Sequence, residues 1–270
     1  MNKTKKAWIV YRDEIELKEP VAIVGSPGLR SIGKLVVDEL VDKLQTRLFA
    51  ELYSYGFPAI YYGPSYLGAP GSAGVRIAKD GVTELPCVKF YGVKSGKQDI
   101  IIVKGYQAYN SLNQYVVAEK VTGLFNAYHV KKVVSLGAQV IEEGIRCCAT
   151  DLELLDDMLY KFGTQKTNVD RFIGFSGIVV AVGRAKGLKG VCLFANTTQN
   201  SEYPEAPDYD AAAELLEKLS EVLGFEIDSS DLKRRRSEGK PQINMAKSLE
   251  AIEEKAEKVE QESEYLRGYV

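Results

Sequence analysis

Short, continuous apolar runs alternate along this chain with stretches whose apolar residues recur at helical spacing. The runs lie at residues 7–11, 21–25, 48–53, 100–104, 132–137, 178–182 and 191–195. Because they are continuous rather than alternating with polar residues, they are typical of strands that are buried on both faces of a sheet. The run 178–182 is also consistent with the start of a helix.

Helical stripes cover residues 31–44, 111–126 and 208–223. Strands in alternation with helices predict an α/β fold, a three-layer α/β/α sandwich around a central sheet. Residues 57–74 are rich in Pro, Gly and Tyr and break this alternation. They predict a long loop, and loops of that length are usually functional or lie at an assembly surface.

Composition narrows the class of protein. A chain of 270 residues with 45% hydrophobic residues is long enough for one large globular domain, or one domain with an appendage. The 35 Lys and Arg residues nearly balance the 37 Asp and Glu residues, which argues against general nucleic-acid binding. No apolar run reaches the roughly 18 residues of a membrane span, and the basic N-terminus lacks a secretory apolar stretch. We therefore expect a cytoplasmic protein without nucleic-acid or membrane partners.

Metal and disulfide chemistry are not indicated by the cysteines. Cys87, Cys147, Cys148 and Cys192 form no CxxC pair, and the chain has one histidine. We expect buried thiols, no metal site and no cofactor. The adjacent Cys147 and Cys148 could be redox-active, but no neighbouring cations indicate a lowered thiol pKa.

The stretch GLRSIGKL follows the strand-like VAIVG and opens a predicted helix. Its spacing, with Gly28, Gly33 and Lys34, resembles the phosphate-binding loop G-x-x-x-x-G-K, but Leu35 stands where Ser or Thr would bind Mg²⁺. We favour a structural interpretation, in which Gly25 and Gly28 form a tight turn, Gly33 lets the helix approach the sheet and Lys34 faces solvent. An anion-binding turn at Gly25, Gly28, Gly33 and Lys34 is the alternative.

Motifs for catalysis are weak. The GFSG stretch around Ser176 lacks the spacing of the nucleophile elbow, and His129 ends a predicted helix, where a solvated or capping role is common. Adjacent carboxylates such as Asp156 and Asp157 diverge by about 100° on a helix and form no acid–base pair. We expect no catalytic triad.

The last segment differs in kind from the rest. After a predicted exposed hinge at residues 233–241, residues 242–267 predict one long helix with apolar residues at heptad spacing. The main seam residues are Met245, Leu249, Ile252, Val259 and Leu266. Such a seam either packs on the chain's own domain or pairs with a second copy, and both remain open.

Residues 268–270 form a predicted tail. Gly268 is suited to end the helix at the C′ position, which leaves Tyr269 and Val270 beyond it. An aromatic side chain is unusual at a terminus, where residues usually contribute little to structure.

Several stretches in succession resemble the PAC2 family of proteasome assembly chaperones and their archaeal relatives. The first is VAIVGSPGLRSIGKLVVDELV, followed by DIIIVKGYQ, VVSLGA, RFIGFSGIVVAVGRAKGLKGVCLFANT and YPEAPDYDAAAELLEKLSEVLG with IDSSDL. The resemblance spans roughly residues 20–232 and implies a PAC2-like α/β/α domain over residues 1–232, related in shape to nucleoside phosphorylases. It further implies a non-enzymatic chaperone that binds proteasome α-subunits.

Some archaeal members of this family end in a hydrophobic residue, a tyrosine and a final residue, and this tail docks between α-subunits. Tyr269 and Val270 match its last two positions, whereas Gly268 replaces the hydrophobic residue. Several tails on a homo-oligomer would recover affinity through effective concentration. The resemblance therefore implies a docking tail at Gly268, Tyr269 and Val270. The alternative function is a ligand-binding protein or enzyme that acts on a phosphorylated or nucleoside-like molecule at residues 25–34.

Overall fold

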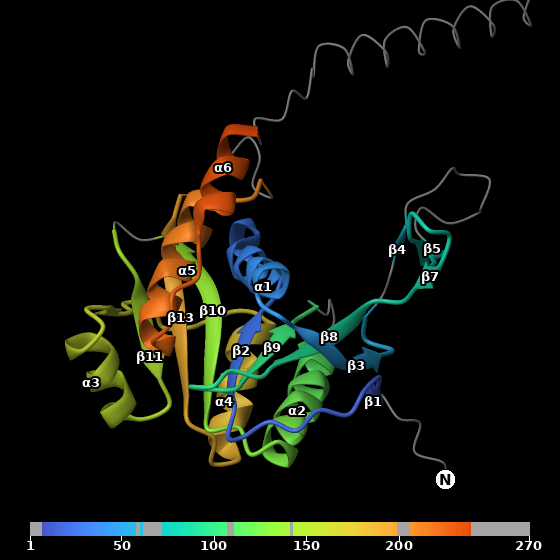
Figure 1. Ribbon diagram of the computed structural model, residues 1–270, viewed down its shortest axis with the longest axis horizontal. Coiled ribbons are helices and arrows are strands. Elements are labelled where there is room, and N and C mark those ends of the chain that lie inside the picture. Colours follow the sequence, from blue (N-terminus) through green and yellow to red (C-terminus); the bar gives the residue numbers. More distant parts are fainter. Residues whose placement is uncertain are drawn as a thin grey trace, which may run out of the picture. The chain divides into compact units, whose positions relative to one another are not determined.

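The computed structural model describes residues 7–57, 60–61, 72–106, 111–140, 143–198 and 206–238. The chain divides by its internal contacts into two units, Met1–Arg234 and Arg235–Val270. Almost all described residues belong to the first unit, which is built around one nine-stranded sheet (Figure 1).

The strands of this sheet lie in the order β1-β3-β8-β9-β2-β10-β13-β11-β12. Their bounds are β1 (Ala7–Tyr11), β3 (Arg47–Ser54), β8 (Cys87–Val93), β9 (Ile100–Lys104), β2 (Val21–Gly25), β10 (Lys132–Val140), β13 (Gly190–Thr197), β11 (Arg146–Ala149) and β12 (Gln165–Lys166). The central strands β9, β2, β10 and β13 are parallel to one another. Antiparallel pairs flank them, so the sheet is mixed.

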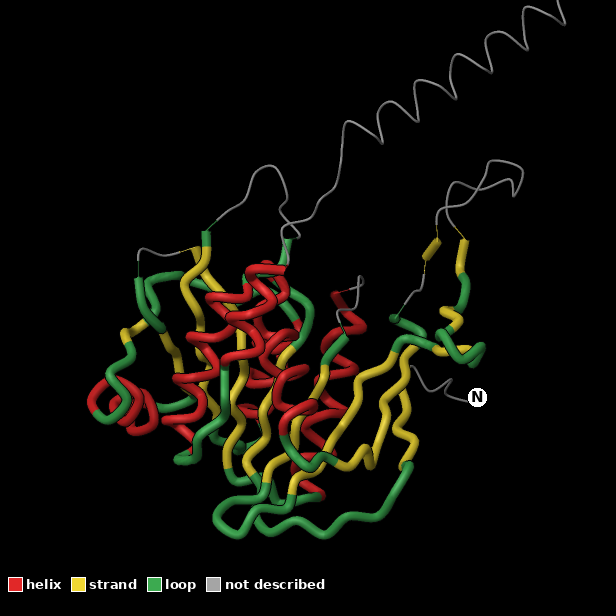
Figure 2. Tube along the Cα trace, turned by 45° about the horizontal axis from the view of Figure 1, so that its top comes forward, coloured by secondary structure: helices red, strands yellow, loops and turns green. Residues whose placement is uncertain are grey.

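Helices cover both faces of the sheet, as the two views in Figures 1 and 2 show. The helices are α1 (Ile32–Lys43), α2 (Ser111–Ala127), α3 (Leu152–Tyr160), α4 (Phe175–Ala185), α5 (Tyr209–Leu223) and α6 (Ser230–Glu238), and the 3-10 turn η1 (Leu29–Ser31) precedes α1. One core lies under α1 and α5, and a second core lies under α2 and α4. The predicted three-layer α/β/α fold is confirmed.

The two cores explain why the strands are continuously apolar. Successive side chains of a strand point to opposite faces, so Ile23 enters the core of α1 and α5 while Ala22 and Val24 enter the core of α2 and α4. Every residue of β2 is buried. A sheet covered on both faces therefore needs an apolar residue at every position of its central strands.

One predicted strand is wrong. Residues 178–182 belong to α4, which begins after Gly174 and buries Phe175, Val179, Val180 and Gly183 along one stripe. The alternative that this run starts a helix is correct. The other six predicted strands and the three predicted helices are confirmed, with small differences at their ends.

Residues 57–74 lie partly outside the described residues. At their edges β4 (Ile60–Tyr61) pairs with β5 (Ser72–Ala73), and β6 (Arg76–Ile77) pairs with β7 (Thr83–Glu84) immediately afterwards. The predicted stretch therefore contains short hairpin pairing in addition to loop. Among the described residues, no helix is long and apolar enough to cross a membrane.

Helix α6 corrects the first part of the predicted hinge at residues 233–241, because the backbone stays helical through Glu238. Leu232 is buried in the core of α1 and α5. Lys43 of α1 forms ion pairs with Asp231 at 2.6 Å and with Asp228 at 3.2 Å. These contacts fix the start of α6 on the domain. The predicted helix at residues 242–267 and the tail at residues 268–270 lie outside the described residues.

The cysteines are free thiols. Cys147 and Cys192 are buried, whereas Cys87 and Cys148 are half-buried, so the expectation of buried thiols holds fully for two of the four. Burial raises the pKa of Cys87 to about 11 and also raises the pKa of Cys147. Both are therefore protonated and weakly nucleophilic near neutral pH.

A close approach between β2 and α1 leads to the first prediction. A Cβ atom on Gly25 would lie 2.2 Å from the carbonyl oxygen of Gly33, and neither backbone can move freely. We expect Gly25→Ala to lower the free energy of unfolding by about 3 kcal/mol, measured by equilibrium urea denaturation. Gly28→Ala is the control, because its Cβ would meet no atom closer than 4.0 Å and its φ of −165° suits alanine. Equal effects of the two substitutions would refute this packing.

The start of α6 leads to a pH prediction. Hydrogen bonds from Ser230, together with Lys43, lower the pKa of Asp228 to about 2 from an ordinary value of 3.8. A carboxyl group whose pKa is lower in the folded state than in the unfolded state stabilises the fold at pH values above the unfolded-state pKa. This stabilisation is lost as the pH falls through the folded-state pKa. We therefore expect Asp228→Asn to lower the urea midpoint at pH 6, and the gap from the unsubstituted protein to close between about pH 4 and pH 2.

The exposed Asp156 of α3 provides the control. Asp156→Asn should leave the urea midpoint unchanged at both pH values. A gap for Asp228→Asn that stays constant down to pH 2 would show that the carboxylate charge does not anchor α6.

Candidate functional site

A cavity of about 1060 Å³ lies at the carboxyl ends of β2 and β10, beside the start of α1 and the start of α4. In open α/β sheets, ligands bind in the crevice outside the carboxyl ends of the parallel strands. The turn after β2 forms one wall, and residues 169–176 form the opposite wall. We refer to this space as the strand-end cavity, and it is the candidate functional site.

Only part of the predicted anion-binding turn lines this cavity. Gly28 and Gly33 line it, Gly25 lies beneath the turn against Gly33, and Lys34 does not line it. The Lys34 ammonium pairs instead with Asp38 at 2.5 Å, one turn along α1. The structural interpretation of Gly33 agrees with the contacts, because a Cβ there would lie 2.8 Å from the carbonyl oxygen of Leu136.

Arg30 is the cation at this turn, although the motif spacing pointed to Lys34. Arg30 and Ser31 both have positive φ angles, of 47° and 56°. Such a backbone is costly for residues with a Cβ and persists only where the surroundings hold it. Here it turns the Arg30 side chain away from α1 toward the residues that precede α5.

The Arg30 guanidinium is held by several oxygens. It donates to Asp208 Oδ2 at 2.8 Å and to the carbonyl oxygen of Ala206 at 3.0 Å. Asp208 also accepts from the Thr197 hydroxyl at 2.6 Å and caps α5 through the Ala211 N–H. Because Arg30 and Asp208 are 14% and 16% exposed, the pair is largely desolvated. The ion pair links the turn after β2 to the end of β13 and the start of α5.

Ser26, Ser176 and Gln139 are buried polar residues of the lining. Ser26 Oγ and Ser176 Oγ lie 3.0 Å apart, and both residues are buried. Gln139 of β10 is also buried and accepts a hydrogen bond from the Thr167 hydroxyl at 2.9 Å. Sequence reasoning missed Ser26 and Gln139. A polar residue at the end of a buried strand was the available signal for Gln139, because β10 extends to Val140 and not only to residue 137.

The cavity does not hold the groups of a serine hydrolase. Ser176 lies in the first turn of α4, and the residues that line the cavity include no His, Asp or Glu among those described. His129 is an exposed residue after α2, with a φ of 52°. The described part of the chain also contains no group of three His, Cys, Asp or Glu residues placed to hold a metal ion.

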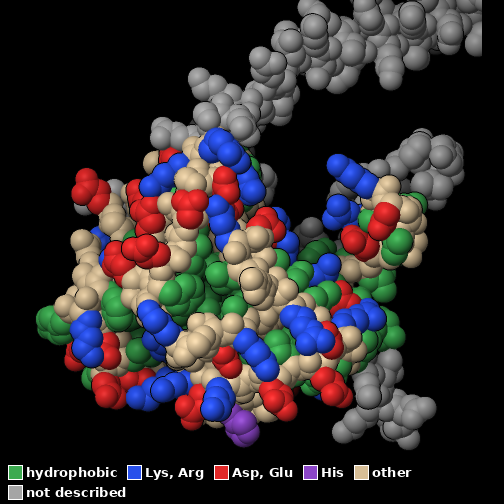
Figure 3. All heavy atoms as spheres, in the orientation of Figure 1, with side chains coloured by type: hydrophobic (Ala, Val, Ile, Leu, Met, Phe, Trp, Pro, Cys, Tyr) green, Lys and Arg blue, Asp and Glu red, His purple; other side chains and the backbone are tan. Residues whose placement is uncertain are grey.

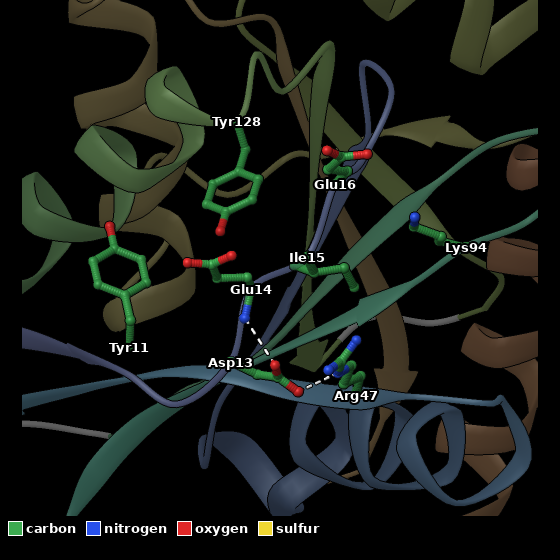
Figure 4. Close-up of a pocket in the computed structure, with 8 residues that line it drawn as sticks. All are labelled: Tyr11, Asp13, Glu14, Ile15, Glu16, Arg47, Lys94 and Tyr128. Atoms are coloured by element: carbon green, nitrogen blue, oxygen red, sulfur yellow. Dashed lines mark hydrogen bonds and ion pairs between the residues drawn. The ribbon is translucent and has the colours of Figure 1, made fainter.

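A second hollow, of about 740 Å³, lies beside the end of β1 and the start of β3 (Figure 4). Its lining residues are Tyr11, Asp13, Glu14, Ile15, Glu16, Arg47, Lys94 and Tyr128. Asp13 forms an ion pair with Arg47, and the Glu14 carboxylate lies toward the Tyr128 hydroxyl. Burial, with the neighbouring Tyr11 and Glu14, raises the pKa of Tyr128. This hollow is a weaker candidate for a ligand site than the strand-end cavity, because its lining carries charges of both signs and it does not lie at the carboxyl ends of the parallel strands.

The surface carries charges of both signs. Lys and Arg side chains are interspersed with Asp and Glu side chains over the visible face (Figure 3). A nucleic-acid surface concentrates positive charge in one area. This face shows no such concentration of positive charge.

The predicted partner-binding residues lie outside the described residues. They comprise the heptad residues Met245, Leu249, Ile252, Val259 and Leu266 and the tail residues Gly268, Tyr269 and Val270. Their roles remain predictions.

The chain is similar to a known protein family and to several known proteins. The model of the PAC2 family matches residues 22–266. An uncharacterized protein of Methanocaldococcus jannaschii is 26% identical over 256 residues, which cover 93% of this chain and 88% of the relative.

Two solved structures from Pyrococcus furiosus share the architecture. PbaB, an archaeal proteasome activator, is 24% identical with a TM-score of 0.71 over 94% of this chain and 100% of its own. PbaA, an archaeal homolog of proteasome-assembly chaperone, is 21% identical with a TM-score of 0.67 over 98% and 100%. At these identities the likeness establishes the fold.

The buried ion pair leads to a prediction about coupling. Arg30→Met leaves the Asp208 carboxylate desolvated without its cation, so we expect a loss of about 3 kcal/mol in the free energy of unfolding. Combining it with Asp208→Asn, which keeps an acceptor for the α5 cap, should cost about 1–2 kcal/mol less than the sum of the single changes. Equilibrium denaturation of the four proteins measures this coupling.

The Asp170–Arg171 pair is the matched control. Its N–O distance is 2.6 Å, but the side chains are 75% and 72% exposed. The same double-mutant cycle on this pair should show no measurable coupling, because exposed ion pairs contribute little. Equal coupling in the two cycles would contradict a special role for burial at Arg30.

Proposed function

This chain belongs to the PAC2 family, and we propose on that basis that it is a proteasome assembly chaperone or adaptor that binds proteasome α-subunits. We infer that it acts without catalysis, as a protein-binding module in the cytoplasm. The family match over residues 22–266 is the observation that carries the proposal. The shared architecture with PbaB, a proteasome activator, and PbaA, a chaperone homolog, supports it.

The proposed contact with the α-ring is the C-terminal tail. Tyr269 inserts its ring into a pocket between α-subunits, and such burial contributes roughly 1.5–3 kcal/mol. The terminal carboxylate of Val270 pairs with a lysine of the groove, as in other modes of C-terminal capture. Gly268 supplies no side chain to this contact, so each tail binds weakly.

Self-association compensates for the weak single tail. The heptad residues Met245, Leu249, Ile252, Val259 and Leu266 pair with those of further copies in the proposed homo-oligomer. Several tails on one particle then bind the same ring, and the second contact occurs at a high effective concentration.

Native mass spectrometry with archaeal 20S proteasome tests the tail. We expect the full chain to co-migrate with the particle and a chain truncated after Arg267 to lose this complex, because truncation removes the Tyr269 ring and moves the terminal carboxylate to Arg267. The truncated chain should keep its own oligomeric mass and thermal midpoint, which separates loss of docking from loss of folding. Undiminished binding by the truncated chain would move the interface to the folded domain, and no binding by either chain would overturn the proposal.

Point substitutions refine the same test. Tyr269→Ala should weaken binding about tenfold or more, whereas Gly268→Leu should strengthen it by restoring an apolar anchor. Val270→Ala is the matched control, because it retains the terminal carboxylate and should change binding little.

A further inference from the structure

The strand-end cavity contains a buried hydrogen-bond donor without a partner. Gln139 is 7% exposed, and its Nε2 atom has no hydrogen-bond partner among the described residues. The Thr167 hydroxyl donates to Gln139 Oε1 at 2.9 Å, and its oxygen accepts from the Val169 N–H. The NH₂ group is therefore the unsatisfied end. An unpaired buried amide destabilises a fold by about 1–3 kcal/mol, so it indicates a missing acceptor.

A second donor follows from the serine pair. Ser26 and Ser176 are 8% and 3% exposed, and their hydroxyl oxygens lie 3.0 Å apart. Each hydroxyl has one proton. One of the two protons forms the hydrogen bond between the serines, whichever residue donates it. The proton of the other hydroxyl is then available for a hydrogen bond to a ligand. The serine pair and the Gln139 amide line the same cavity.

The charges around these donors favour an anion. Helix α4 begins at the cavity after Gly174, which has no side chain to cap the first N–H groups. That end of a helix carries partial positive charge. The charged residues among those described as lining the cavity are Arg30 and Arg171, and none is Asp or Glu. Because Arg30 is paired with Asp208 and Arg171 with Asp170, a ligand group here meets mainly neutral donors and the partial positive charge at the start of α4.

The rim of the cavity is apolar. The apolar and aromatic lining residues are Leu29, Tyr106, Val140, Val169, Phe172 and Ile173. Ile173 and Val140 are 82% and 58% exposed although they are large apolar residues. A volume of about 1060 Å³ is at the upper end of the range for small-molecule sites. The space therefore suits a ligand with an anionic head and an apolar body.

We infer that the strand-end cavity binds a small molecule whose oxyanion accepts hydrogen bonds from Gln139 Nε2 and the Ser26–Ser176 hydroxyl pair, while its apolar body lies against Phe172 and Ile173. Phosphate and carboxylate groups share this chemistry. The site is separate from the proposed tail contact, so either can fail without the other.

Calorimetric titration of the full-length protein tests the inference with four probes. Phenyl phosphate carries a tetrahedral oxyanion on an apolar ring, phenylacetate carries a carboxylate on the same ring, inorganic phosphate carries the oxyanion alone, and benzyl alcohol carries the ring alone. We expect one of the two aromatic anions to bind saturably, at least tenfold more tightly than inorganic phosphate, and benzyl alcohol not to bind. The stronger aromatic anion identifies the head group.

Substitutions locate the site. Gln139→Glu keeps the acceptor for Thr167 but replaces the free amide by an anionic oxygen, so we expect at least tenfold weaker binding of the preferred probe. Lys34→Ala is the control, because it removes a positive charge from the same turn without touching the cavity, and affinity should be unchanged. Equal affinity in Gln139→Glu and the unsubstituted protein would overturn the inference, as would a loss of affinity in Lys34→Ala equal to that in Gln139→Glu.

A measurement on the unsubstituted protein covers the case in which Gln139→Glu fails to fold. Titration of the preferred probe, followed by ¹H–¹⁵N correlation spectra, should shift the side-chain amide resonances of Gln139 and the backbone amides at the start of α4. Saturable binding without these shifts, or no saturable binding by any probe, would overturn the inference.

Discussion

The close contact between Gly25 and Gly33 determines how the chain turns at the carboxyl ends of the central strands. Without side chains at these two positions, the first turn of α1 lies directly on the backbone of β2 and of Leu136 in β10. The chain must therefore reverse over a few residues after β2, and it does so with two residues of positive φ, Arg30 and Ser31. The tight turn then forms one wall of the strand-end cavity.

The same constraint explains why the turn resembles a phosphate-binding loop in spacing and differs from it in chemistry. Gly25 and Gly33 are needed for close packing of helix on sheet, whereas Gly28 is not closely packed, so the glycine spacing does not by itself indicate a nucleotide. Lys34 points along α1, where it shares Asp38 with Lys104 of β9. Arg30 takes the position near the cavity, but Asp208 already neutralises it. Any anion in the cavity therefore depends mainly on neutral donors.

The fold was predictable from the sequence to the extent that burial decides local structure. Central strands buried on both faces are recognisable as continuous apolar runs, as in β2 and β9. The same rule failed at residues 178–182, because a short apolar run in a buried helix such as α4 looks the same over five residues. The strand β8 alternates in burial and β11 has four residues, so neither gave a strong signal. The cavity was less predictable, because Ser26 and Ser176, like Arg30 and Asp208, meet only through the fold.

A line of contacts leads from the cavity wall to the C-terminal part of the domain. Arg30 holds Asp208 at the start of α5, and Glu217 of the same helix accepts from Ser229 and Lys233 at 2.6 Å each. Contiguity alone does not transmit a signal, because coupling requires an element with two discrete arrangements. Helix α5 buries seven residues, among them Leu215, Leu216 and Leu219, and repositioning it would expose this face. Its packing makes α5 a rigid support for the Asp208 side of the turn after β2.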